Sequence, residues 1–138
     1  MHISETSIVK INLVLQCLLL LFVIFGGYLA KIRHQYKIHC RILRIATVLQ
    51  IISIAAIMLP AMLGYIHRGD RNSLFNTAMW IHHILGLLVV ALWVYINLVF
   101  QGVIKGFVKL AIPMRLAFFL WIIVLMLGIY LYLVTWVL

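Results

Sequence analysis

Apolar side chains occupy four long segments of the chain, at roughly residues 8–30, 42–66, 78–104 and 114–137. Each segment has at least about 20 residues, enough for a helix to cross a hydrocarbon core of roughly 30 Å. Helices are expected because lipid offers no partners to free backbone groups, and four segments are too few to close a barrel. The pattern therefore predicts an all-α integral membrane protein, a single four-helix transmembrane bundle over residues 1–138.

The composition supports a lipid environment. Of the 138 residues, 67% are hydrophobic and only 9% are charged, and the mean hydropathy is +1.24. A water-soluble domain needs more polar residues to cover its surface. A net charge of +9 would suggest nucleic acid binding in a soluble protein. Here the basic residues gather in short loops between apolar segments, which is typical of membrane topology, so no nucleic acid partner is expected.

The basic residues are divided unequally between the two ends of the predicted bundle. Eight of the eleven lie in or beside the loops at 31–41 and 105–113, whereas the opposite end carries three basic residues and both acids. By the positive-inside rule, these two loops lie in the cytoplasm and both chain termini lie outside. We expect a multi-pass protein of a prokaryotic cell membrane. The eight residues are Lys31, Arg33, Lys37, Arg41, Arg44, Lys105, Lys109 and Arg115.

The first apolar segment is expected to be a transmembrane helix and not a cleaved signal. It is longer than the apolar region of a signal peptide, and Glu5 precedes it. It also runs into a basic loop without a small-residue cleavage site.

Proline and polar residues interrupt two of the apolar segments. Pro60 is expected to kink its helix and to free the carbonyl group near residue 56. Gln50, Ser53 and Asn97 are polar within apolar spans, and we expect them to face protein. They either bond one helix to another or bind the head group of a quinone.

Three histidines gather at the outer end of the second and third segments. His67 closes the second segment, and His82 and His83 lie near the start of the third. The short connection between the segments would bring His67 near one of the pair. Haem b in a helix bundle is usually held by two neutral imidazoles from neighbouring helices. The sequence therefore predicts a haem b site here, and the alternative is that these histidines are ordinary interfacial side chains.

Small and basic residues flank the histidines. Gly64 lies three residues before His67, and Gly86 lies four residues after His82, so each glycine shares a helix face with a histidine. Such glycines either leave room for a flat cofactor or let helices approach closely. Arg68 and Arg71 lie at the water boundary, where haem propionates need cations. Other small residues in the spans are Gly26, Gly27, Ala55, Ala56, Ala61 and Gly128.

The adjacent His82 and His83 point in different directions. Consecutive residues on a helix are about 100° apart, so only one of the two faces a given cofactor. His82 shares its face with Gly86, whereas His83 shares a face with bulkier residues. The glycine therefore favours His82 as the ligand.

A second interpretation of this cluster uses sulfur. Met58 and Met62 lie four residues apart on one helix face, and Met79 precedes the adjacent histidines. Thioethers combined with imidazoles suit Cu(I). The alternative is that these methionines fill the core, which is the usual role of methionine at helical spacing.

The order of the motifs resembles a family of small four-helix bacterial and archaeal membrane proteins that are encoded near haem–copper terminal oxidases. One branch of that family contains an oxidase maturation factor. The stretch HCRILRIA, from His39 to Ala46, is similar to the family's helix-opening pattern, and the last helix carries Arg115 and Trp121 in a similar arrangement. The resemblance covers roughly residues 35–138.

The family's histidine positions match only in part. His67 stands at the far end of the second helix, and His82 or His83 stands at the start of the third, with His83 aligning slightly better. The histidine that usually precedes the family's last helix is missing, because no histidine lies between residues 84 and 138. The resemblance thus implies that an outer site is kept and an inner site is lost.

Three functions stay open at this point, all without an independent catalytic centre. The resemblance implies a link to aerobic respiration, and the histidines suggest a b-type haem-binding electron-transfer or accessory subunit of the respiratory chain. The first alternative is an oxidase maturation factor that handles copper or haem, and the second is a cofactor-free accessory subunit. The expected partners are lipid, a larger membrane complex of the respiratory chain and a quinone. The chain has neither a Walker loop nor a carboxylate pair.

The predicted orientation can be tested by cysteine labelling in a variant whose Cys17 and Cys40 are replaced by serine. Asn72→Cys should react with a membrane-impermeant maleimide added to intact cells, and Gly106→Cys should react only after the membrane is opened. The reverse pattern would refute the orientation.

Overall fold

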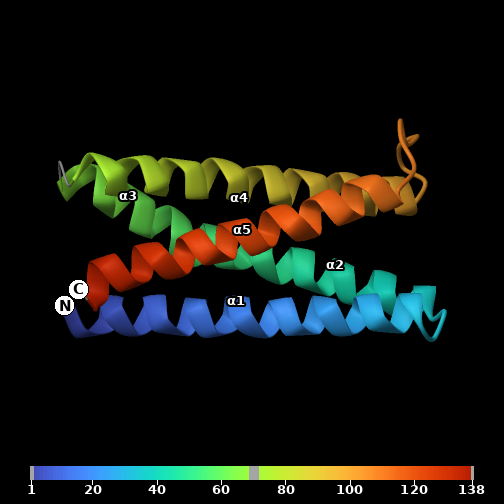
Figure 1. Cartoon of the computed structure of the whole chain (residues 1–138), viewed down its shortest axis with the longest axis horizontal. Helices are drawn as coiled ribbons and strands as arrows, with labels where there is room; N and C mark the ends of the chain where they lie inside the picture. Colours follow the sequence, from blue (N-terminus) through green and yellow to red (C-terminus); the bar gives the residue numbers. More distant parts are fainter. Residues whose placement is uncertain (1, 69–71, 138) are drawn as a thin grey trace. The chain divides into compact units, whose positions relative to one another are not determined.

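The computed structural model describes residues 2–68 and 72–137, and these residues are almost entirely helical, with no β-strand among them (Figure 1). Four of the described helical segments are long and apolar enough to cross a membrane, which confirms the predicted all-α fold. The chain divides into two compact units, residues 1–68 and 69–138. A single-domain arrangement of the two units and the side of the termini stay predictions. The four segments are Ser7–Lys31, Tyr36–His67, Ser73–Phe100 and Ala111–Thr135.

The first unit is a helical hairpin in which α1 (His2–Lys31) packs against a second long helical segment. That segment consists of α2 (Tyr36–Ser53), the π-helical turn η1 (Ile54–Met58) and α3 (Leu59–Arg68). Between α1 and α2 the chain reverses through a short turn, in which His34 takes a left-handed φ of 53°. The second helical segment therefore begins six residues before the predicted position 42.

The π-helical turn η1 lies directly before Pro60. Proline has no N–H to donate, and its ring crowds the carbonyl group four residues earlier, which here belongs to Ala56. The N–H of Leu59 donates to the carbonyl oxygen of Ile54, five residues earlier, as in a π-helix. The disturbance predicted near residue 56 is thus a wider helical turn.

A polar network joins α1 to α2. Ser53 Oγ donates to Asn12 Oδ1 at 2.6 Å, and Gln16 Nε2 donates to Ser53 Oγ at 3.4 Å. Gln50 lies one turn before Ser53 and is buried like it, as expected for polar residues that face protein. Interhelical hydrogen bonds of this kind contribute about 1 kcal/mol each within a membrane. Helix-to-helix bonding is therefore the observed role of Ser53.

Close packing brings α1 and α2 together near their connection. A Cβ added at Gly26 would lie 2.9 Å from Ile42 Cγ2 and 3.4 Å from Ile42 Cβ. The neighbouring Gly27 has no atom within 4 Å of such a Cβ. Gly26 therefore allows the close approach of the two helices, and Gly27 does not contribute to it.

The second unit is a hairpin of α4 (Ser73–Phe100) and α5 (Ala111–Trp136). Helix α4 begins five residues before the predicted position 78, because the side chain of Asn72 caps it by accepting from the N–H of Leu74 at 3.4 Å. It ends at Phe100 and not at residue 104, since Gly102 adopts a left-handed φ of 73°. Helix α5 begins at Ala111, three residues before the predicted start.

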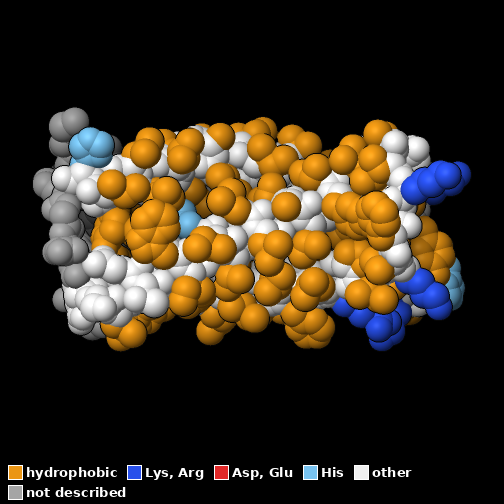
Figure 2. Space-filling model, turned by 90° about the horizontal axis from the view of Figure 1, so that it is seen from above, with side chains coloured by type: hydrophobic (Ala, Val, Ile, Leu, Met, Phe, Trp, Pro, Cys, Tyr) orange, Lys and Arg blue, Asp and Glu red, His pale blue; other side chains and the backbone are white. Residues whose placement is uncertain are grey.

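Two tryptophans form the centre of the second hairpin. Trp93 of α4 and Trp121 of α5 are 5% and 2% exposed. Their ring centroids are 4.8 Å apart and the planes make an angle of 83°, the edge-to-face geometry that aromatic pairs prefer. Trp121 lies near the start of its span, where a membrane interface is also a common place for tryptophan, but it packs inside the hairpin. Most other large apolar side chains remain on the helix surfaces, and the lysines and arginines that are visible lie near helix ends (Figure 2).

We expect leucine at position 26 to destabilise the first hairpin, because its side chain must displace the β-branched Ile42. Overpacking of this kind costs about 1–3 kcal/mol. Gly27→Leu is the matched control and should change the free energy of unfolding by less than about 0.5 kcal/mol. Unfolding by sodium dodecyl sulfate in mixed micelles measures both, and equal destabilisation by the two variants would contradict the assigned contact.

Candidate histidine site

The residues of the predicted cofactor site are divided between the two units. His67 lies near the end of α3 in the first unit, and His82 and His83 lie in the first half of α4 in the second. The pairing of His67 with either of them stays a prediction. Arg71 lies outside the described residues, and so does the side chain of Arg68, so their role toward propionates also stays a prediction.

His82 is held by the neighbouring helix of its own unit. Its Nδ1 lies 3.0 Å from the carbonyl oxygen of Val124 in α5. A carbonyl oxygen only accepts, so Nδ1 must donate and must carry the ring hydrogen. In the neutral ring, Nε2 then keeps its lone pair, which is the form of imidazole that binds a metal.

Gly128 makes this contact accessible. In an α-helix the carbonyl of residue 124 points toward residue 128, and a side chain there would cover it. A Cβ at Gly128 would lie 3.1 Å from His82 Cε1 and 3.7 Å from His82 Nδ1. The missing side chain therefore leaves the space in which the imidazole reaches Val124.

His83 and His67 are bonded in a similar way, each within its own helix. His83 Nδ1 donates to the carbonyl oxygen of Met79 at 2.8 Å, and His67 Nδ1 donates to that of Leu63 at 3.2 Å. Nε2 therefore carries the lone pair in each of these rings as well, when neutral. The rings of His82 and His83 have centroids 5.3 Å apart and are nearly perpendicular.

The two glycines of the predicted site have different surroundings. A Cβ added at Gly86 would lie 3.8 Å from Val124 Cγ1, an ordinary contact distance, so Gly86 faces α5. Gly64 is half-buried in α3. The room for a porphyrin that each was expected to provide stays a prediction.

Gly128 is the residue that the sequence pattern did not connect with the histidines. It could be found only as one of several small residues in the spans. Its position opposite His82 depends on the register of α4 against α5, which the connection at 101–110 determines. The sequence does show that a glycine at position 128 leaves the carbonyl of Val124 uncovered. It does not show which side chain of the neighbouring helix reaches that carbonyl.

The methionines of the alternative copper set are also divided between the units. Met58 and Met62 are half-buried in the first unit, and Met79 is buried in the second. Among residues 2–68 and 72–137, no group of three or more His, Cys, Asp or Glu side chains could hold a metal ion. The copper interpretation, with its thioether ligands, stays a prediction.

Two of the three candidate quinone residues form hydrogen bonds within the protein. Asn97 Nδ2 donates to the carbonyl oxygen of Trp93 at 2.8 Å, and Ser53 belongs to the network between α1 and α2. Gln50 Oε1 is buried without a hydrogen-bond partner among the described residues. The interaction of these residues with a quinone stays a prediction.

Comparison with known proteins found no matching family model, no matching curated protein and no matching solved structure. The resemblance to oxidase-associated proteins therefore stays a prediction from the motifs.

The assigned hydrogen bond can be tested by nitrogen-15 NMR of histidine-labelled protein. His82 should show a protonated Nδ1 and an unprotonated Nε2 at neutral pH. Gly128→Ala should weaken this preference, because the added methyl group forces the ring away from Val124. Gly86→Ala is the matched control, since its Cβ makes only ordinary contact. An unchanged His82 spectrum in Gly128→Ala would contradict the role of Gly128.

Proposed function

We propose that this protein is an integral membrane protein of the respiratory chain that binds a b-type haem, as an electron-transfer or accessory subunit. His82 is the proposed axial ligand in the second unit, and His67 is the proposed second ligand. One observation supports the proposal above the others. His82 is oriented by a hydrogen bond from its Nδ1 to Val124 on another helix, while its Nε2 is left for a metal.

The residues present fit the requirements of haem iron. Histidines that bind metals almost always donate their other ring N–H to a carbonyl or carboxylate, which fixes the ring orientation and raises the basicity of the ligand nitrogen. The Val124 carbonyl supplies this partner for His82, and the missing side chain of Gly128 leaves the space that the ring itself occupies. When bound between two imidazoles, haem would supply one-electron transfer.

The hairpin itself contributes rigidity and an apolar environment. The edge-to-face packing of Trp93 and Trp121 fixes α4 against α5 in the same unit as His82. A fixed ligand orientation and a surrounding from which water is excluded are the means by which a protein adjusts a metal's redox potential. We propose respiratory partners from the motif resemblance, and the four helices of membrane-spanning length support partners within a membrane.

Copper is the second candidate. The observation that favours it is that Met79, a buried methionine, lies about one turn before His82 and His83 in the same helix. A thioether and imidazoles are soft ligands that suit Cu(I). In this case the protein would act as a maturation factor that handles copper.

An absorption spectrum of the purified protein tests the proposal. Protein from haem-replete membranes should show a Soret band and a sharp α-band after reduction. His82→Ala and His67→Ala should abolish the low-spin spectrum while insertion is unchanged, because insertion depends on the apolar spans. His34→Ala, in the turn between α1 and α2, is the control and should keep the spectrum.

Each other outcome assigns a different role. A colourless protein that contains copper by elemental analysis supports the copper-handling function. A protein with neither group would refute both cofactor proposals and favour a cofactor-free accessory subunit. Loss of the haem spectrum in His83→Ala but not in His82→Ala would transfer the ligand role to His83.

A further inference from the structure

The connection between α4 and α5, residues 101–110, exposes apolar side chains beside lysines. Phe107 is 92% exposed, and Val103 and Val108 are exposed by 64% and 53%. Lys105 and Lys109 are exposed in the same segment. No acidic residue lies between residues 72 and 138. The segment therefore combines an unpartnered aromatic ring with uncompensated positive charge.

The exposed segment is folded back against α4. The N–H of Phe107 donates to the hydroxyl oxygen of Tyr95 at 3.1 Å. A Cβ at Gly106 would lie 3.1 Å from Val99 Cγ1, so the backbone packs closely on the last turns of α4. These contacts hold Phe107 near the end of the helix and do not let it extend freely along the helix axis.

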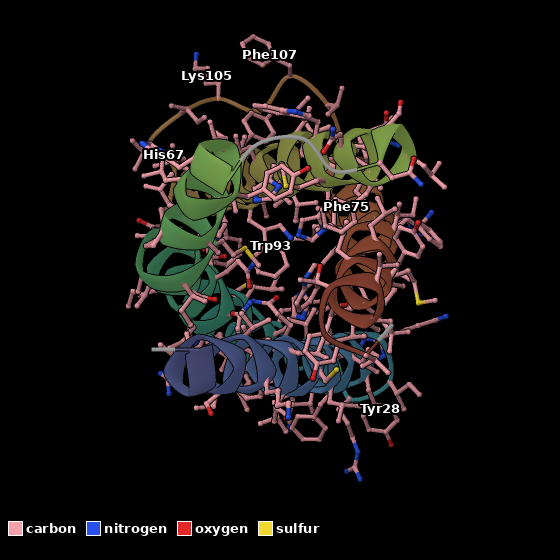
Figure 3. The ribbon with its side chains drawn as sticks, turned by 90° about the vertical axis from the view of Figure 1, so that its left-hand side faces the viewer. Tyr28, His67, Phe75, Trp93, Lys105 and Phe107 are labelled. Carbon is pink, nitrogen blue, oxygen red and sulfur yellow. The ribbon has the colours of Figure 1, made fainter. Side chains whose placement is uncertain are left out.

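The direction of the segment follows from these contacts. In Figure 1 the connection leaves the end of α4 across the helix axes, and in Figure 3 Lys105 and Phe107 project outward beyond α4. Because α4 and α5 have membrane-spanning length, a segment that runs across their ends lies along the membrane surface. An exposed aromatic ring at this depth meets the boundary between head groups and acyl chains, where aromatic side chains are enriched.

We propose that residues 101–110 form an interfacial anchor that binds anionic phospholipid. Phe107 inserts at the boundary of the acyl chains, and Lys105 and Lys109 contact phosphate groups of the surrounding lipid. The charge favours lipid over a protein partner, since lysines on flexible stems reach phosphates from an apolar base. Each lysine near an anionic surface favours the bound state by about fivefold. This proposal is independent of any cofactor.

Site-directed spin labelling tests the anchor in the full-length protein. The label is attached through Phe107→Cys in a variant whose Cys17 and Cys40 are replaced by serine. Its depth is measured by collision with oxygen and with a water-soluble nickel complex. In vesicles of phosphatidylcholine with phosphatidylglycerol, the label at position 107 should be accessible to oxygen and protected from nickel. A label introduced by Arg33→Cys, in the turn between α1 and α2, should be accessible to nickel.

The charge contribution is tested in the same measurement. Changing to phosphatidylcholine alone should make the label at 107 shallower, and Lys105→Gln with Lys109→Gln should remove this lipid dependence. Lys31→Gln with Lys37→Gln, the matched pair in the other connection, should leave it unchanged. Tyr95→Phe should increase the mobility of the label, because the bond to the backbone at 107 is lost.

Two results would overturn the proposal. A label at 107 that is as accessible to nickel as the label at 33 would show that the segment lies in water. A label that is protected from both oxygen and nickel would show that Phe107 packs against protein. Cys40 is half-buried in the first hairpin, and the other variants change exposed positions or remove a single hydroxyl, so the hairpin of α4 and α5 is expected to remain folded.

Discussion

The hydrocarbon core of a membrane offers no hydrogen-bond partners, and this constraint determines most of the described structure. A backbone polar group without a partner in hydrocarbon costs several kcal/mol, so each apolar segment is helical over most of its length. The same constraint acts on side chains. Ser53, Asn12 and Gln16 bond to one another between helices. Three histidines, His67, His82 and His83, direct Nδ1 toward backbone carbonyl groups. The free nitrogen of each imidazole is therefore a consequence of satisfying the other one.

The two hairpins meet this constraint with different side chains. The first combines a glycine contact, Gly26 against Ile42, with the polar network around Ser53. The second uses the aromatic pair of Trp93 and Trp121 together with the bond from His82 to Val124. Side-chain hydrogen bonds thus join the helices of the first hairpin, while in the second an imidazole bonds to a backbone carbonyl of the neighbouring helix.

The sequence predicted the helices well because long apolar runs have a direct physical meaning in a membrane. The helix ends were less predictable. The start of α4 contains Ser73, Asn76 and Thr77, which lower the local hydropathy although Asn72 caps the helix there. The end at Phe100 depends on the left-handed backbone at Gly102, since the following Val103 and Ile104 are as apolar as the helix. Apolar character therefore locates a span but not its last turn.

The positions of the three histidines near helix ends were predictable, but their hydrogen-bond partners were not. Which carbonyl His82 contacts depends on how α4 and α5 align, and no local pattern encodes that alignment. Trp121 shows the same limit, because a tryptophan near the start of a span suits either an interface or a packed core. Residue type suggested which side chains to consider for the candidate site, whereas long-range register determined their hydrogen-bond geometry.

The π-helical turn at Ile54–Met58 has a consequence for the far end of its helix. A π-turn holds one residue more than an α-helical turn, and each residue rotates a helix by about 100°. The faces of α3 are therefore set by this turn and do not continue the faces of α2. The directions in which His67 and Gly64 point around the helix axis therefore depend on the π-helical turn beside Pro60. The π-helical turn rotates α3 by a fixed angle relative to α2. The position of this turn in the helix therefore determines the direction in which His67 points.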